Sequence, residues 1–168
     1  MTERQFMPTA SRRVKPTGLV RRLLHVPDLL YRWHLGWLLG HRFLLLTHRG
    51  RKSGLVRRTV LEVVYYDPAT RESVVLSGLG ATADWYRNIE AQPATMVQTG
   101  RRRYPPRHRL LAPAEAAAVA AEFARRHPLE ARVAVRVLGR LGWSAGDEHP
   151  TWPALAAEIP MVAFRPRD

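Results

Sequence analysis

The chain has 168 residues, a length that suits one domain with a real core, and its 46% hydrophobic residues exclude a disordered protein. It contains no cysteine, which excludes disulfides, thiolate metal sites and a cysteine nucleophile. The net charge of +13, from 27 basic and 14 acidic residues, indicates an anionic partner: a nucleic acid, a phosphorylated cofactor or an acidic lipid surface. Only Lys15 and Lys52 are lysines, so a compositional bias toward arginine is an alternative source of part of this excess.

The N-terminal part of the chain is predicted to be an arm followed by two short helices. Residues 1 to 18 are polar and predict a mobile arm, which leaves residues 19–168 as a single domain. Apolar and basic residues mix at helical spacing over residues 19–39, where Pro27 divides two amphipathic helices. No secretory signal is recognised, so we expect a cytoplasmic protein. The apolar stretch at residues 29–46 carries too much charge to span a membrane, and peripheral contact with its inner face is the alternative.

The next segment predicts a hairpin and then a loop that leads into a helix. The sequence "RFLLLTHRGRKSGLVRRTVLEVVYY" reads as two strands, 42–48 and 56–66, joined by a turn that contains Gly and Ser. A short strand over residues 73–77 follows. Gly78 and Gly80 then open a loop before the predicted helix "ADWYRNIEAQ", which stops before Pro93.

The remaining elements complete a small barrel. We expect strands at 94–99 and 102–111, the second one at an edge or with a bulge because it contains Pro105 and Pro106. Two helices follow, from Pro113 to about residue 127 and from Leu129 to about Leu141. After a loop, "IPMVAF" forms a closing strand. About six mostly antiparallel strands with flanking helices predict an α+β barrel.

The strongest local motif is the glycine-bounded turn Gly50–Gly54, which is followed by Arg57 and Arg58. Two glycines let the backbone approach a ligand, and four cations and a hydroxyl surround it, so the motif favours a phosphate or carboxylate. Its spacing differs from that of a nucleotide P-loop. A solvated basic hairpin turn explains the same charge equally well.

A second motif, "SGLGATADWYRN", joins a glycine-rich loop to the start of a helix. Flexible backbone beside aromatic side chains suits a flat ring system. Taken alone the signal is weak, because Trp85 and Tyr86 equally fit a hydrophobic core and Asn88 a satisfied polar group.

Together, "LLLTHRGRKSGLVRRTVLEVV", "VVLSGLG" and "DWYRNIEAQP" resemble the F420-dependent quinone reductase and deazaflavin-dependent nitroreductase family. The resemblance covers roughly residues 19 to 112 and continues more weakly into the C-terminal helices and "IPMVAF". It implies a split β-barrel of the flavin-reductase-like type that binds coenzyme F420, an 8-hydroxy-5-deazaflavin. It also implies an oxidoreductase that passes a hydride from the reduced deazaflavin to an organic acceptor: a quinone, a nitro compound or an activated double bond.

The resemblance also assigns the residues that contact the cofactor. It implies that the turn binds the anionic tail through Arg51, Lys52, Ser53, Gly54 and Arg57, with Arg58 as a helper. It places Val60 and Leu61 beside the deazaflavin ring, Ser77, Gly78 and Gly80 on the other side, and Trp85 and Asn88 where they close the site. We expect Arg51 and Lys52 to be exposed when no ligand is bound.

The chain departs from the family pattern at the acceptor pocket. Leu79 stands where a lysine is common, and Glu62 and His127 stand where pocket tyrosines are expected. The acceptor is therefore open, and Glu62 and His127 become the candidates that orient or protonate it. The alternative for His127 is a structural role at a helix end.

Three alternatives accompany this interpretation. The same fold holds FMN or haem in related split barrels. A nucleic-acid-binding barrel is a second alternative, with the basic residues Arg101, Arg102, Arg103, Arg107 and Arg109 around Tyr104. The third extends the reductase reading with peripheral membrane contact through residues 19–40, which include Arg21, Arg22, Trp33 and Trp37. The spacing of the seven histidines favours no metal site, and no nucleophile motif surrounds Ser144.

Overall fold

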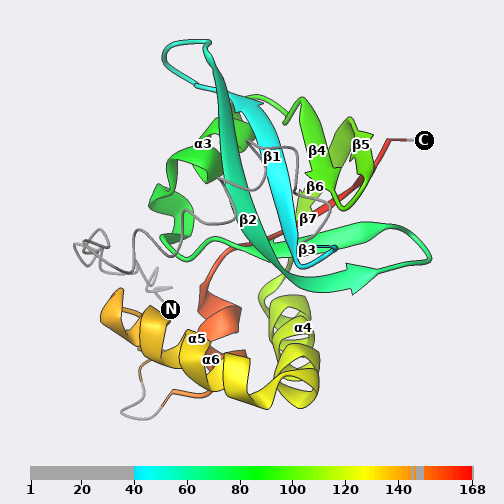
Figure 1. The fold of residues 1–168 in the computed structure, drawn as a ribbon. Helices are drawn as coiled ribbons and strands as arrows, with labels where there is room; N and C mark the ends of the chain where they lie inside the picture. Colours follow the sequence, from blue (N-terminus) through cyan, green and yellow to red (C-terminus); the bar gives the residue numbers. More distant parts are fainter. Residues whose placement is uncertain (1–39, 145, 147–149, 168) are drawn as a thin grey trace, which may run out of the picture.

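The computed structural model describes residues 40–144, 146 and 150–167, and Figure 1 shows their fold. The predicted arm and the predicted helices over residues 19–39 lie outside the described residues. The elements are, in chain order, β1 (Phe43–Arg49), β2 (Val56–Asp67), β3 (Glu72–Leu76), the 3-10 helix η2 (Gly80–Thr82), α3 (Asp84–Ala91), β4 (Met96–Thr99), β5 (Arg102–Tyr104), β6 (Pro106–Leu110), α4 (Pro113–Arg126), α5 (Pro128–Arg140), α6 (Trp152–Glu158) and β7 (Met161–Pro166).

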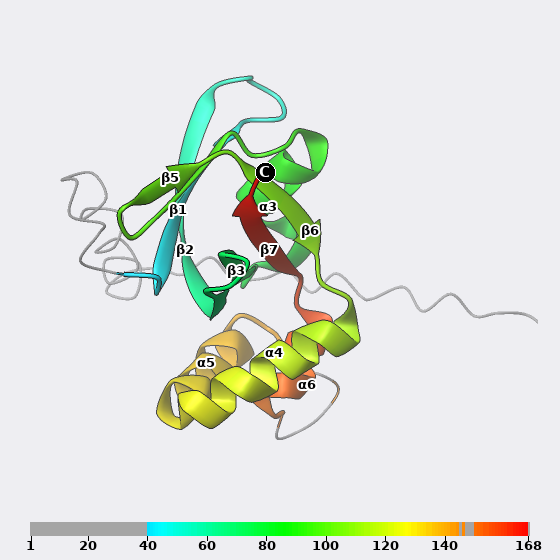
Figure 2. The same cartoon turned by 90° about the vertical axis from the view of Figure 1, so that its right-hand side faces the viewer.

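The strands form one sheet that curls into a nearly closed barrel (Figures 1 and 2). The strand order is β5-β4-β1-β2-β3-β7-β6, and each neighbouring pair is antiparallel. The two edge strands, β5 and β6, are separated in the chain by Pro105 alone, so the two edges of the sheet meet there. The predicted α+β barrel is confirmed, with seven strands among the described residues rather than about six.

The extra strand comes from the segment predicted as one strand over residues 102–111, a prediction that was wrong. Tyr104 pairs with Val97 of β4, whereas Pro106 pairs with Pro166 of β7 at the opposite edge. Pro105 has no N–H to donate to a ladder, and its carbonyl accepts a hydrogen bond from the Arg167 N–H at 3.1 Å. The chain therefore passes from one edge of the sheet to the other at this proline.

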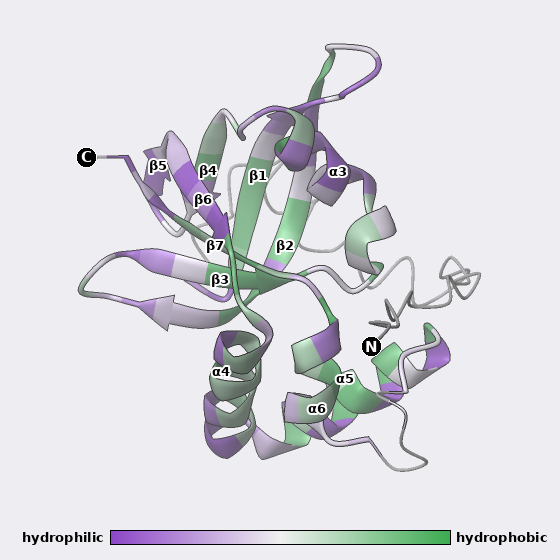
Figure 3. Cartoon of the chain, turned by 180° about the vertical axis from the view of Figure 1, so that it is seen from behind, coloured by the Kyte–Doolittle hydropathy of each residue, from purple (hydrophilic) through white to green (hydrophobic). Residues whose placement is uncertain are grey.

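The barrel interior is an apolar core that α3 closes at one end. Leu44 and Leu46 of β1 and Phe164 of β7 are fully buried. They pack in one cluster with Trp85 and Ile89 of α3. Along β1 and β2, residues that face the interior alternate with residues that face outward, as expected for strands with one buried face. Figure 3 shows a mainly hydrophobic β1, whereas β5 and β6 are more hydrophilic.

A second apolar layer lies between the sheet and the helices α4, α5 and α6, which gather on one side of the barrel (Figures 1 and 2). Val74 and Met161 face these helices, while their neighbours Val75 and Val162 face the interior. Helix α6 was not predicted from the sequence. It is only seven residues long, and its burial of Trp152 and Leu155 is decided by packing rather than by a long periodic pattern. None of the described helices is long and apolar enough to cross a membrane.

The burial difference between two leucines gives a direct test of this fold. We expect Leu46→Ala, in the fully buried core of β1, to lower the free energy of unfolding by about 2–5 kcal/mol. Leu129→Ala is the matched control, because Leu129 is 72% exposed on α5 and its loss should cost less than about 0.5 kcal/mol. Urea unfolding followed by circular dichroism measures both, and similar losses in the two variants would show that β1 is misplaced.

Candidate functional site

The turn between β1 and β2 has a fixed backbone shape that depends on its two glycines. The Gly54 N–H donates to the Gly50 carbonyl at 2.7 Å, and the Gly50 N–H donates to the Leu55 carbonyl at 2.9 Å. Gly54 has φ +67°, which disfavours other residues. A Cβ atom at Gly50 would lie 2.7 Å from the Ser53 hydroxyl oxygen. The predicted hairpin with a Gly- and Ser-containing turn is confirmed.

Arg51 of this turn is bound to α3. Its backbone N–H and its Nη1 each donate to Asn88 Oδ1 at 3.0 Å, and Nη1 also donates to Asp84 Oδ1 at 3.0 Å. The side chain is only 23% exposed. Arg51 is exposed as a residue, as expected, but Asp84 and Asn88 hold its guanidinium against the helix, which was not predicted. Lys52 is exposed as expected.

Asn88 and His48 continue this contact into the barrel. Both side chains are buried, at 5% and 2% exposure. Asn88 Nδ2 lies 3.2 Å from His48 Nδ1, and His48 Nε2 lies 3.2 Å from Thr59 Oγ1. Burial lowers the pKa of His48, and the positive charge of Arg57 adds to this effect. His48 was not among the predicted site residues, because a single histidine within a strand carries no signal of its own.

The cations around the turn include three without an ion-pair partner. Within residues 40–144, 146 and 150–167, Lys52, Arg57 and Arg58 take part in no salt bridge. A group of unpaired cations beside an exposed, glycine-shaped backbone fits an anionic ligand. Arg57 and Arg58 are neighbours on β2, so they start on opposite faces of the strand. Arg57 lies across from His48, and Arg58 lies across from Thr47.

The glycine-rich loop after β3 is also closely fixed. Ser77 is fully buried, and its hydroxyl donates to the Gly80 carbonyl at 2.8 Å. Gly80 has φ +64°, and Trp143 Nε1 donates to the Gly78 carbonyl at 2.9 Å. The loop leads through η2 into α3, so the contacts of Arg51 with α3 bring the two sequence motifs together.

Three other predicted ligand residues have their side chains in different surroundings. Trp85 is 9% exposed and packs in the barrel interior. Leu61 is 8% exposed in the same core, whereas Val60 points to the opposite face of β2. That face carries Arg58, Val60 and Glu62 in succession, and Arg58 and Glu62 are about 13 Å apart at the usual strand rise.

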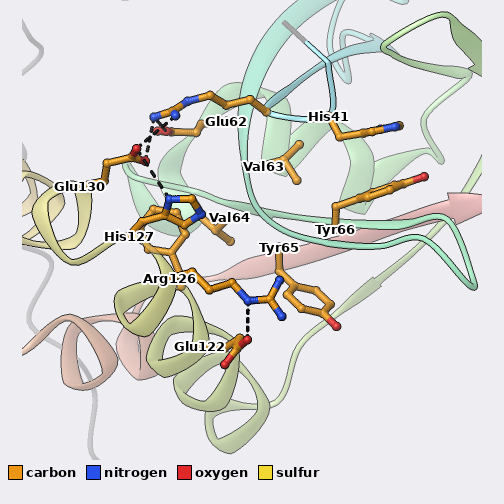
Figure 4. Close-up of a pocket in the computed structure, with 12 residues that line it drawn as sticks. His41, Glu62, Val63, Val64, Tyr65, Tyr66, Glu122, Arg126, His127 and Glu130 are labelled. Atoms are coloured by element: carbon orange, nitrogen blue, oxygen red, sulfur yellow. Dashed lines mark hydrogen bonds and ion pairs between the residues drawn. The ribbon is translucent and has the colours of Figure 1, made fainter.

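The two candidate catalytic residues, Glu62 and His127, line the same cavity (Figure 4). Its volume is about 260 Å³, and it lies between the far end of β2 and the junction of α4 with α5. The ring of His41 stacks on Tyr66 at 3.9 Å, and both line the cavity. The other lining residues are Arg42, Val63, Val64, Tyr65, Glu122, Phe123, Arg126 and Glu130. Ser77, Gly78 and Gly80 do not line it.

Charged residues at the cavity form a connected set around Arg42. Arg42 donates to both carboxylate oxygens of Glu130, at 3.2 and 2.8 Å, and lies 3.8 Å from Glu62. The Glu62 side chain is 53% exposed, and the protein around the cavity removes part of its water. Desolvation therefore raises the pKa of Glu62, with Arg42 opposing the shift and Glu130 adding to it. The raised pKa keeps this carboxyl group protonated to a higher pH than an ordinary glutamate.

His127 occupies the junction between two helices and also faces the cavity. It ends α4 and precedes Pro128 of α5. Its Nδ1 lies 3.8 Å from Glu130 Oε1, and its ring lies 5.2 Å from that of Phe123. The residue thus has the position required by either interpretation, a helix-end role or a contact with the acceptor.

The basic segment 101–109 does not form a single binding strip. Tyr104 packs against the interior core, and Arg109 is paired with Glu72 and Glu115 at 2.8 and 2.7 Å. Of the remaining arginines, Arg102 and Arg103 lie on β5, Arg107 lies on β6 and Arg101 lies in the turn before β5. This arrangement gives little support to stacking of nucleic-acid bases on the segment. Among the described residues, no three acidic or histidine side chains are grouped to hold a metal ion.

Comparison with known proteins gives matches to both sequences and structures. A family model described as F420H(2)-dependent quinone reductase matches residues 34–136. A putative F420H(2)-dependent quinone reductase of Mycobacterium tuberculosis is 41% identical over 66 residues, which are 38% of this chain. The match spans about half of that curated relative, 54% of its length.

Two solved structures also resemble the chain. An F420-H2 dependent reductase named FDR-A shares 21% identity at a TM-score of 0.48, over 76% of this chain and 96% of that one. An FMN-binding protein of Nostoc punctiforme, related to pyridoxamine 5'-phosphate oxidase, shares 14% identity at a TM-score of 0.45. That match covers 84% of this chain and 79% of the other.

The contact between the turn and α3 predicts a difference between two neighbouring substitutions. Asn88→Leu leaves the Arg51 N–H and the His48 ring without their buried partner, so we expect a loss of about 1–3 kcal/mol of unfolding free energy. Asp84→Ala removes only an ion pair whose carboxylate is 86% exposed, and should cost less than about 1 kcal/mol. Chemical unfolding measures both. An unchanged stability of Asn88→Leu would contradict the contact.

Proposed function

The chain belongs to the F420H(2)-dependent quinone reductase family, and we propose on that premise that it binds coenzyme F420 and reduces an organic acceptor. The observation that carries the proposal is a group of cations, Lys52, Arg57 and Arg58, that have no ion-pair partner among the described residues and lie at a glycine-shaped turn fixed to α3. A second observation supports it: the cavity that contains Glu62 lies at the other end of β2.

The turn is proposed to bind the anionic tail of the cofactor. Lys52, Arg57 and Arg58 supply charge, and the Ser53 hydroxyl supplies a hydrogen bond. Arg51 differs from them, because its contacts with Asn88 and Asp84 make it a clamp that shapes the turn. The same proposal keeps Gly54, Val60, Ser77, Gly78, Gly80 and Asn88 around the cofactor. It limits Leu61 and Trp85 to backbone contacts, because their side chains are in the core.

The cavity at the α4–α5 junction is proposed to hold the acceptor. When bound, the reduced deazaflavin supplies a hydride, and the acceptor needs one proton in addition. Glu62 is placed to donate this proton and to regain it from solvent. Aromatic side chains from Tyr65, Tyr66 and Phe123 line the same cavity, which favours a planar acceptor such as a quinone.

The first prediction concerns the cofactor. We expect the protein to bind oxidised F420 and not FMN in calorimetric titrations, because only the longer anionic tail engages all the cations of the turn. Lys52→Ala, Arg57→Ala and Arg58→Ala should each weaken F420 binding about tenfold or more, since a hydrogen bond to a charged group contributes about 1.5–3 kcal/mol. Arg132→Ala is the control, because Arg132 is an exposed arginine on α5, away from the turn.

Two outcomes would contradict this assignment. Equal F420 affinity in all four variants would show that the turn is not the anion site. Preference of the wild-type protein for FMN would support the alternative in which the family fold holds a different ligand.

The second prediction concerns Glu62. Its raised pKa keeps the carboxyl protonated to higher pH than usual, so acceptor reduction should fall as the pH rises through this pKa. We expect Glu62→Gln to lower kcat by about 10²-fold or more and to abolish this pH dependence, with F420 affinity unchanged. Glu122→Gln is the control in the same cavity, because Arg125 and Arg126 lower the pKa of Glu122 to about 2 and keep it ionised. Equal kcat values in Glu62→Gln and wild type would exclude Glu62 as the proton donor.

A further inference from the structure

The buried residue His48 links the interior of the barrel to the turn at Gly50–Gly54. It lies in β1, 2% exposed, between Thr59 of β2 and Asn88 of α3. Asn88 in turn accepts two hydrogen bonds from Arg51. The shape of the turn at Arg51 therefore depends on a chain of side chains that begins with Thr59 and passes through His48.

The hydrogen bonds of Asn88 determine the protonation of His48. Asn88 Oδ1 faces the two N–H groups of Arg51, so Nδ2 is the atom that faces His48. Nδ2 can only donate, and His48 Nδ1 must therefore accept and carry no proton. The proton of the neutral ring is then on Nε2, which donates to the Thr59 hydroxyl at 3.2 Å.

Protonation of Nδ1 is incompatible with this arrangement. It would place an N–H of His48 against the NH₂ group of Asn88. If the Asn88 amide rotated to present its oxygen to His48, its NH₂ group would instead meet the two N–H groups of Arg51. Either way, one of the two contacts is lost.

We propose that His48 is a positioning residue that fixes the anion-binding turn through Asn88, and that protonation of His48 releases Arg51 and weakens anion binding there. The inference rests on the proposed function only for the identity of the anion. The coupling between His48 and Arg51 follows from the contacts of the ligand-free chain.

The charges around His48 favour its neutral form. Burial and the positive charge of Arg57 on β2 lower its pKa, while Asp84 on α3 and a backbone hydrogen bond at Arg49 raise it by less. Arg51 lies on the far side of Asn88, and Asp84 is already paired with it. Because its pKa is below the ordinary value for histidine, His48 is neutral at neutral pH. It becomes charged only at a lower pH than an ordinary histidine.

A simple charge effect predicts the opposite outcome, which makes the inference testable. A protonated His48 adds a positive charge near Arg57, so Coulomb attraction alone would strengthen anion binding in acid. The positioning role predicts weaker binding in acid, because Arg51 and the turn lose their fixed geometry.

The first experiment measures the protection of the Arg51 amide against hydrogen exchange in the ligand-free protein, at pH 5 and pH 7.5. We expect protection in the wild type at pH 7.5 and about a tenfold loss at pH 5 beyond the intrinsic rate change. His48→Ala should be unprotected at both values. His48→Gln should be protected at both, because its amide oxygen accepts from Asn88, its amide nitrogen donates to Thr59, and it does not titrate. Equal protection in the wild type and His48→Ala would overturn the inference.

The second experiment measures anion affinity with sulfate, which keeps its charge over this range, and with oxidised F420. Other titrating groups change the affinity of both proteins alike, so their effect cancels in the ratio of wild-type to His48→Gln affinity. We expect this ratio to fall about tenfold from pH 7.5 to pH 5. A ratio that rises in acid would support the charge effect and overturn the inference. If F420 fails to bind at either pH while the exchange and sulfate results hold, the proposed function fails and the role of His48 stands.

Discussion

The buried amide of Asn88 is the contact on which the candidate site depends. It joins residues that are distant in sequence, Arg51 in the β1–β2 turn and His48 within β1, to helix α3. The amide oxygen accepts from Arg51, and the amide nitrogen faces His48. Arg51 is also held by Asp84, and His48 by Thr59. A hairpin tip that projects from a sheet is ordinarily mobile. Here the tip is bonded to a helix whose other face closes the barrel core, so the rigidity of the core extends to the turn.

Carboxylates neutralise part of the large positive charge of the chain. Arg42, Arg109, Arg125 and Arg126 are paired with carboxylates on the sheet and the helices. These pairs are mostly exposed and contribute little to stability one by one. At the turn, Lys52, Arg57 and Arg58 lack such partners among the described residues, so this end of β2 keeps an excess of positive charge. The cavity at the other end of β2 mixes arginines with glutamates and is close to balance.

Sequence analysis succeeded where structure is decided by neighbouring residues. The glycines and serine of the β1–β2 turn, the proline at the start of α4 and Pro128 between α4 and α5 act locally, and these elements were predicted nearly to the residue. The resemblance also indicated the F420-dependent family and the barrel. The split at Pro105, by contrast, depends on which strands β5 and β6 pair with, and helix α6 forms because Trp152 and Leu155 find a core to pack against.

At the candidate site, too, local features were predicted and long-range contacts were not. The sequence identified the cationic turn and the residues Glu62 and His127, which the structure brings to one cavity. It did not predict that Arg51 is paired with Asp84 or that Leu61 and Trp85 have their side chains in the core. The contacts of His48 were not predicted from the sequence either. The contacts of Arg51 and His48 join residues 33 and 40 positions apart, which a local pattern does not encode.

The position of β7 has a consequence for how the protein is made. β7 is the last strand in the chain, yet it lies between β3 and β6 and pairs with both. On the ribosome, the preceding strands emerge first and expose the unpaired edges of β3 and β6 until Met161–Pro166 has left the exit tunnel. Barrel closure therefore waits until β7 has been made, and a nascent chain that stalls before residue 161 presents two unpaired edges to chaperones and to other chains.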